Sequence, residues 1–127
     1  RLSKEAKELN KLSINTIALM SNDVIQYPED SYENMKLFAK KYDFTFPYLY
    51  DESQNVAKEY GAVCTPDIFG FNNKNLLCYR GRIDSGVMNS DHKNIDRELY
   101  NAMVKIKNDG IGPDKQLNSF GCSIKWK

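Results

Sequence analysis

The stretch Gly61-Ala-Val-Cys-Thr-Pro-Asp-Ile-Phe-Gly-Phe71 decides the fold, because it joins the end of a helix to an apolar strand through a proline. Pro66 lacks a backbone N–H donor and pushes Thr65 toward an extended conformation. Cys64-Thr65-Pro66 is therefore predicted as a turn or the start of a strand. The Thr65–Pro66 bond is a candidate cis peptide, since only X-Pro bonds carry a small penalty for that isomer. An ordinary trans proline is the alternative.

The residues on either side predict a helix before this stretch and a hairpin within and after it. Asp51-Glu-Ser-Gln54 has the form of a capping box, in which the last side chain can bond back to the first residue. Apolar residues then share one helical face up to Tyr60, and Gly61 suits a left-handed residue at the helix end. Apolar runs at 67–71 and 76–80 are separated by asparagines that favour a turn, so an antiparallel hairpin is expected.

The rest of the chain alternates helical and strand patterns. Helices are predicted over 1–12, over about 31–42 and from 95 to near 110, because apolar residues recur there at helical spacing. The run 14–20 suits a strand covered on both faces, as in parallel sheets. The run 44–50 contains a proline, which cannot donate to a ladder, so a short or edge strand is expected.

Composition indicates one ordinary globular domain of 127 residues, 41% hydrophobic and 28% charged. Eighteen basic and seventeen acidic residues nearly cancel, so no nucleic-acid partner is indicated. No apolar run approaches the roughly 18 residues that span a bilayer, so no membrane partner is expected. The tail, residues 111–127, is expected to pack on the domain, because Phe120, Ile124 and Trp126 are too apolar to be left in water.

The cysteines and the histidine are too few and too scattered for a disulfide scaffold or a zinc site. The residues are Cys64, Cys78, Cys122 and His92. No metal and no other cofactor is therefore expected. A Cys-His nucleophile pair has little support, because His92 lies in a polar loop and nothing in the sequence brings it to a thiol.

Several short stretches stand out beside this order of elements. They are Ser21-Asn22-Asp23, Tyr27-Pro28-Glu29-Asp30-Ser31, Phe46-Pro47-Tyr48-Leu49-Tyr50-Asp51, Tyr60-Gly61-Ala62, Cys64-Thr65-Pro66-Asp67, Tyr79-Arg80-Gly81-Arg82-Ile83-Asp84 and Gly121-Cys122-Ser123-Ile124-Lys125-Trp126. Together they resemble thioredoxin-like proteins of the redoxin group, the alkyl hydroperoxide reductase and thiol-specific antioxidant type, over nearly the whole chain.

The resemblance implies an α/β, thioredoxin-like three-layer fold, in which helices cover both faces of a mixed sheet. It implies that Pro66 is the cis-proline of that fold, and that Thr65 presents backbone groups to a thiol site and to an extended substrate. Arg80 and Arg82 would lie beside the substrate groove.

The chain also departs from the family pattern. In such proteins the nucleophilic cysteine follows the first core strand, at the amino end of the helix that here spans 1–12, where free N–H groups stabilise a thiolate. These 127 residues contain neither that strand nor that cysteine, so we expect an N-terminally truncated domain. The absent strand would lie between those at 14–20 and 67–71. A lone copy would then expose strand edges that favour a homodimer.

Cys64 and Cys122 are candidate resolving thiols, and the alternative for each is a small side chain that simply packs. Cys78, in an apolar strand, is expected in the core. Arg80 and Arg82 alternate along one strand, where they either bind substrate or form a solvated face.

The resemblance implies a thiol-disulfide oxidoreductase or a thiol peroxidase, an antioxidant that acts on a protein disulfide or a peroxide and draws on a thioredoxin-type reductant. This chain alone is expected to be inactive, because the nucleophile lies outside it. The other hypothesis is a non-catalytic module that pairs an extended peptide with the groove beside Thr65 and Pro66. Absence of a leader before Arg1 favours the cytoplasm, but a truncated chain would lose a leader too.

Overall fold

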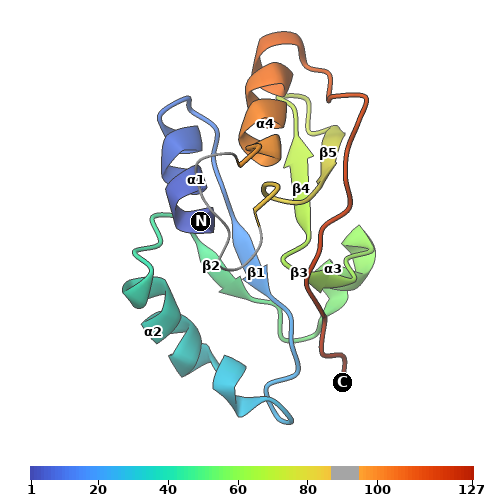
Figure 1. Ribbon diagram of the computed structural model, residues 1–127. Coiled ribbons are helices and arrows are strands. Elements are labelled where there is room, and N and C mark those ends of the chain that lie inside the picture. The colour runs from blue at the N-terminus through green and yellow to red at the C-terminus, as the bar shows by residue number, and fades with distance from the viewer. Residues whose placement is uncertain (87–94) are drawn as a thin grey trace. The chain divides into compact units, whose positions relative to one another are not determined.

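A computed structural model describes residues 1–86 and 95–127 (Figure 1). The chain divides into two compact units, of which unit 1 comprises Arg1–Val63 and Ser123–Lys127 and unit 2 comprises Cys64–Cys122. His92 lies outside the described residues. Among the described helices, none is long and apolar enough to cross a membrane.

Unit 1 combines helices with a parallel pair of strands. Its elements are α1 (Leu2–Asn10), β1 (Ala18–Met20), the 3-10 helix η1 (Pro28–Asp30), α2 (Tyr32–Lys41), β2 (Tyr48–Tyr50) and α3 (Asn55–Tyr60). Leu19 of β1 lies opposite Leu49 of β2 in the parallel register. The amide of Ala18 donates to the carbonyl of Pro47 at 3.0 Å, so the proline takes part in the pairing as an acceptor only.

The strand β1 is shorter and less covered than the sequence predicts. Three residues form the strand in place of the predicted run 14–20. Met20 is 8% exposed, but Leu19 is 44% and Ile17 is 61% exposed. Successive side chains of a strand point to opposite faces, so one face of β1 is covered and the other is not. The prediction that both faces are covered is wrong for this strand.

Unit 2 is a hairpin packed against a helix. Its elements are β3 (Cys64–Thr65), β4 (Ile68–Phe71), β5 (Leu77–Gly81) and α4 (Glu98–Asp109), and β3 pairs with β6 (Cys122–Ser123), the strand at which the chain leaves the unit. The predicted antiparallel hairpin is confirmed, since Phe69 lies opposite Arg80. Asn75 supplies the left-handed residue of the turn, with φ of 60°.

The core of unit 2 forms where α4 crosses the hairpin. Leu99, Ala102, Met103 and Ile106 are buried at helical spacing along α4, and Tyr79 of β5 is 1% exposed. The packing is close at Gly70, where a Cβ would lie 2.5 Å from the sulfur of Met103 and 3.2 Å from Cβ of Tyr79.

Helix ends follow the predicted glycines. α3 ends at Tyr60 and α4 ends at Asp109, and the next residues, Gly61 and Gly110, have left-handed φ values of 69° and 75°. Glycine adopts this conformation without the steric cost that a side chain brings.

The described strands form three two-stranded sheets, β1–β2, β3–β6 and β4–β5. Mixed helix and strand content confirms the α/β class. The single mixed sheet is not observed among the described residues, because each strand there pairs with one partner only. The three-layer arrangement and the N-terminal truncation stay predictions.

Candidate thiol site

The turn predicted from Cys64-Thr65-Pro66 lies in unit 2, and its Thr65–Pro66 bond is cis. The hydroxyl of Thr65 donates to the carbonyl of Cys122 at 3.4 Å. A Cβ on Gly121 would overlap the carbonyl oxygen of Thr65, so only glycine allows the chain to pass this close. Residues 121 and 122 therefore lie against Thr65, the residue that was predicted to present its backbone to a substrate.

The thiol of Cys64 is half-buried and lies 3.7 Å from the carbonyl oxygen of Pro66. Burial raises the pKa of this thiol, the carboxylate of Asp67 raises it further, and the guanidinium of Arg80 opposes them. Because the thiolate is the nucleophilic form, a raised pKa makes Cys64 a poor first nucleophile at neutral pH.

The charges beside Cys64 are paired with one another. The side chain of Asp67 is 5% exposed, and its Oδ2 lies 3.2 Å from Nη2 of Arg80. The guanidinium of Arg80 also lies over the ring of Phe69, 4.9 Å from its centroid. A buried carboxylate costs free energy unless it is paired, so Arg80 is needed where it is, and part of its side chain still faces solvent.

Arg82 follows the last residue of β5 and binds at a different place. Its Nη2 lies 2.7 Å from Oε1 of Glu98, the first residue of α4. The hydrogen bond to Glu98 raises the pKa of the Arg82 guanidinium. The hydroxyl of the buried Tyr79 donates to the carbonyl of Arg82, and burial raises the pKa of Tyr79 to about 12. The two arginines thus have separate partners within unit 2.

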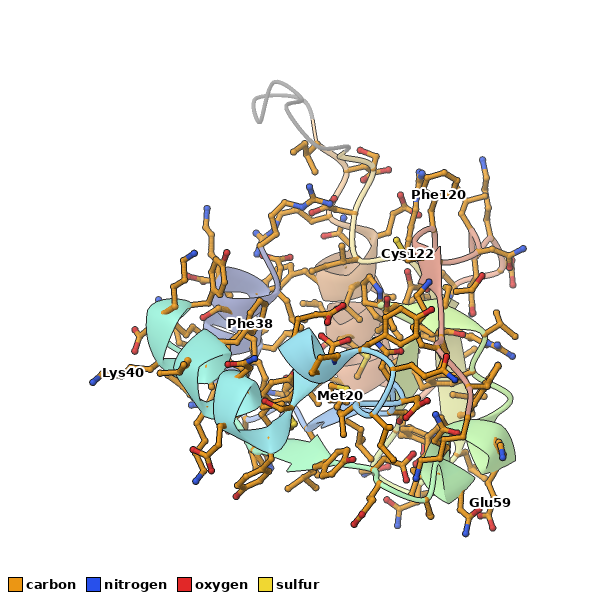
Figure 2. All side chains as sticks on the ribbon, turned by 90° about the horizontal axis from the view of Figure 1, so that it is seen from below. Met20, Phe38, Lys40, Glu59, Phe120 and Cys122 are labelled. Atoms are coloured by element: carbon orange, nitrogen blue, oxygen red, sulfur yellow. The ribbon has the colours of Figure 1, made fainter. Side chains whose placement is uncertain are left out.

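The two other cysteines differ in accessibility. Cys122 is exposed and Cys78 is half-buried, and both are free thiols. Figure 2 labels Cys122 together with Phe120, which lies two residues earlier and is 90% exposed. The side chains around Cys122 therefore leave it accessible to a disulfide or sulfenic acid on another molecule.

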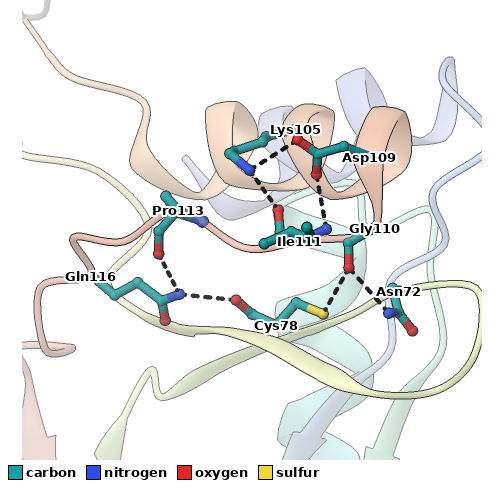
Figure 3. A network of polar contacts seen from close by, with 8 residues as sticks. All are labelled: Asn72, Cys78, Lys105, Asp109, Gly110, Ile111, Pro113 and Gln116. Carbon is teal, nitrogen blue, oxygen red and sulfur yellow. Dashed lines mark hydrogen bonds and ion pairs between the residues drawn. The ribbon is translucent and has the colours of Figure 1, made fainter.

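Cys78 lies in a polar network rather than in an apolar core (Figure 3). Its thiol lies 3.3 Å from the carbonyl oxygen of Leu76 and 3.5 Å from that of Gly110. Nε2 of Gln116 donates to the carbonyl of Cys78 at 2.9 Å, and Oε1 of Gln116 accepts from the amide of Arg80 at 2.9 Å. A side-chain amide thus covers the outer edge of β5 in place of a further strand.

A second polar site, in unit 1, was missed by the sequence analysis. Here Asn22, Asp23 and Gln54, which we call the amide clamp, hold Ser123–Lys127, which we call the returning segment. The carbonyl of Lys125 accepts from the backbone amide of Asp23 at 2.7 Å and from Nε2 of Gln54 at 3.0 Å. Oδ1 of Asn22 accepts from the amide of Lys125 at 2.9 Å.

The capping-box interpretation of residues 51–54 is half right. Asp51 does cap α3, because Oδ2 accepts from the amide of Ala57 at 3.0 Å. Gln54 has a left-handed φ of 67°, and its side chain does not bond back but turns to the returning segment. A residue other than glycine in this region costs of order 1–3 kcal/mol, and the clamp contacts offset that cost. The one sequence signal that bears on this site is the apolar tail, whose residues Ile124 and Trp126 were expected to pack on the domain.

No group of three or more metal-ligating side chains occurs among residues 1–86 and 95–127. Of the predicted site residues, unit 2 brings Cys64, Thr65, Pro66, Arg80 and Cys122 to the neighbourhood of one turn, and it places Arg82 beside α4.

Comparisons with known proteins agree with this architecture. A model of the AhpC/TSA family matches residues 1–83. The crystal structure of an uncharacterized conserved protein from Geobacillus kaustophilus has a TM-score of 0.88 and 42% identity, with 99% of this chain and 67% of that chain covered. The hypothetical protein SMc02350 from Sinorhizobium meliloti 1021 has a TM-score of 0.88 and 35% identity, with 99% and 69% covered. A search of curated proteins gave no match.

Proposed function

Because the chain belongs to the AhpC/TSA family, we propose that it acts in redoxin-type thiol chemistry and supplies the resolving thiols of a thiol peroxidase or thiol-disulfide oxidoreductase. Cys122 is the first resolving thiol and Cys64 the second. The observation that supports this most is the turn at Thr65, where a half-buried thiol and the exposed Cys122 belong to paired strands.

The proposed reaction needs a nucleophilic thiolate that is not one of the three cysteines of this chain. That thiolate attacks the O–O bond of a peroxide, becomes a sulfenic acid, and releases an alcohol or water. The resolving thiol attacks the sulfenic sulfur, an S–S bond forms, and water leaves. A dithiol reductant of the thioredoxin type then reduces the S–S bond by two exchange steps. In the disulfide reaction the first attack falls on a disulfide sulfur instead.

The structure supports different roles for the two candidate thiols. Cys122 is exposed, so a bulky partner can reach it. Cys64 is half-buried with a raised pKa, so it reacts later and only after the partner is bound. Arg80 can still contact a bound partner through its exposed part while it neutralises Asp67.

A thioredoxin variant that retains only its attacking cysteine tests this proposal. The chain is first converted to mixed disulfides with oxidised glutathione and then incubated with that variant. We expect a covalent complex on a non-reducing gel, formed as the thioredoxin thiolate attacks the chain sulfur and glutathione leaves. Cys122→Ser should remove most of the complex, and Cys78→Ser is the control that should keep it. Equal loss in both variants, or no complex, would refute the proposal.

The second candidate function is the non-catalytic peptide-binding module. The observation that favours it is that Thr65 already lies against an extended stretch, residues 121 and 122 of the same chain. A partner peptide would take their place and pair with the backbone of β3. Peptide binding that survives alkylation of all thiols would support this function, whereas binding lost on alkylation would favour the thiol reaction.

A further inference from the structure

Unit 1 carries a built site for an extended backbone. Gln54 is 1% exposed, and both atoms of its amide are used. Nε2 donates to the carbonyls of Ser21, at 2.8 Å, and Lys125, at 3.0 Å, while Oε1 accepts from the amide of Lys127 at 3.1 Å. Buried amides with every polar atom paired have one defined orientation, so Gln54 presents a donor and an acceptor to the segment in fixed positions.

Asn22 is oriented in the same way. Its Nδ2 donates to Oδ2 of Asp30 at 3.1 Å, which leaves Oδ1 facing the amide of Lys125. The clamp residue Asp23 contributes only its backbone amide to the segment, because its own carboxylate accepts from the amide of Ile25 at 3.0 Å.

The clamp contacts recognise the main chain of the segment, and its two lysines add contacts of their own: Nζ of Lys127 donates to the carbonyl of Glu52 at 2.8 Å, and Nζ of Lys125 lies 5.8 Å from the ring centroid of Tyr27. Ile124 is the buried side chain of the segment, at 6% exposed, and Trp126 is 41% exposed with Nζ of Lys58 5.7 Å from its ring centroid. The ligand that fits is therefore an extended peptide with an aliphatic residue followed two positions later by an aromatic one.

We propose that the amide clamp is an exchangeable peptide site, which takes the returning segment of a second copy of this chain as well as its own. The clamp bonds end on backbone groups of the segment, so an identical segment from another copy meets the same partners. The chain reaches the segment through Phe120, which is 90% exposed, Gly121 and the exposed Cys122, and the contacts that hold this connection are those with Thr65 and the pairing of β6 with β3. Exchange of an identical element needs these contacts to open and needs no new interface.

Two full-length variants test the exchange, because Trp126 is the sole tryptophan. The acceptor, Ile124→Asp with Trp126→Phe, keeps the clamp, has a disabled segment and lacks tryptophan. The donor, Gln54→Ala, keeps the segment and lacks the clamp. We expect red-shifted Trp126 emission from the donor alone and a saturable shift to the blue on adding acceptor. Emission that stays constant through the titration would overturn the proposal.

Matched control variants distinguish binding at the amide clamp from nonspecific association of the two chains. An acceptor that also carries Gln54→Ala should give no shift, whereas one that carries Gln26→Ala, a change of an exposed glutamine of unit 1, should behave as the parent acceptor does. A shift that survives Gln54→Ala in the acceptor would count against the clamp.

A peptide keeps the test valid if the donor fails to fold. The synthetic peptide Ser-Ile-Lys-Trp-Lys should bind the acceptor saturably, as followed by its own tryptophan emission. Gln54→Ala in the acceptor should weaken that binding at least about tenfold, because it removes the hydrogen bonds of one buried amide. Absence of binding, or the same affinity in both acceptors, would show that the clamp is not a peptide site.

Discussion

Cys64 and Cys78 are half-buried thiols on two strands of unit 2, β3 and β5, yet their surroundings differ in kind. Cys78 lies within reach of two backbone carbonyls, and its own carbonyl is held by Gln116, so it belongs to a network of neutral groups. Cys64 has one distant carbonyl and a pair of opposite charges, Asp67 and Arg80, that act on its pKa in opposite directions. The first arrangement fixes a thiol in place, whereas the second sets its reactivity.

The comparison gives each thiol a role. Cys78 is structural because both its thiol and its carbonyl are bonded within the network, the thiol to the carbonyls of Leu76 and Gly110 and the carbonyl to Gln116. The pKa of the Cys64 thiol depends on the two neighbouring charges, whereas Cys122 is exposed to solvent. Changes to the network should therefore alter stability first, whereas changes to the charges should also shift the pKa of Cys64 and so its reactivity.

The largest expected loss of stability comes from Gly112→Ala, which disturbs the polar network around Cys78. A Cβ at Gly112 would overlap the backbone carbonyl of Cys78, so the chain after α4 must move away. Overpacking of this kind costs about 1–3 kcal/mol. We expect the free energy of unfolding in urea to fall by that amount, and Cys78 to become more reactive toward iodoacetamide.

Gly110→Ala is the matched control for that change. No atom lies within 4 Å of a Cβ at Gly110, but its φ is 75°. The cost is then that of a left-handed side chain, roughly 1 kcal/mol, and Cys78 labelling should rise less than in Gly112→Ala. Faster labelling of Cys78 in Gly110→Ala than in Gly112→Ala would show that contact with Cys78 is not what matters.

A smaller loss is expected for Gln116→Ala. The change removes the side-chain bonds to the carbonyl of Cys78 and to the amide of Arg80. Because the site is only partly buried, water can replace them in part, and the expected loss is about 1 kcal/mol. Hydrogen exchange should show a faster amide at Arg80, whereas that of Lys125 in unit 1 should be unchanged. Unchanged exchange at Arg80 would mean that Gln116 does not protect the edge of β5.

The last pair of changes, at the charges beside Cys64, is measured by thiol reactivity, which should move in opposite directions for the two residues. The negative charge of Asp67 raises the pKa of the Cys64 thiol and the positive charge of Arg80 lowers it. Asp67→Asn should therefore lower that pKa, increase the thiolate fraction at pH 8 and speed alkylation of Cys64. Arg80→Gln should raise the pKa and slow alkylation.

The pKa of Cys64 in both variants is measured from the pH dependence of iodoacetamide labelling at Cys64. Labelling of Cys78 in the same samples is the internal reference. Shifts of the two profiles in the same direction would contradict the electrostatic explanation.

Local turn chemistry explains what the sequence could predict. Gly61 and Gly110 end their helices, and asparagines turn the hairpin, because each effect depends on residues a few positions apart. The class of fold and the position of the Cys64-Thr65-Pro66 turn followed from these local signals.

Contacts between residues far apart in the chain could not be predicted from the sequence. Gln54 matched a capping box, but its side chain bonds to residues 71 and 73 positions later. Gln116 covers a strand edge 36 and 38 positions earlier. Propensity and periodicity carry no information about such pairs. The exposure of Ile17 and Leu19 was missed for a similar reason, since burial depends on what covers a strand and not on its own residues.

The central claim is that the three thiols have different roles and that Cys122 is the one that partners reach first. Site-resolved mass spectrometry of the full chain, reacted for increasing times with oxidised glutathione, measures this directly. We predict mixed disulfides at Cys122 first, then at Cys64, and last at Cys78. Modification of Cys78 as early as Cys122 would contradict the claim.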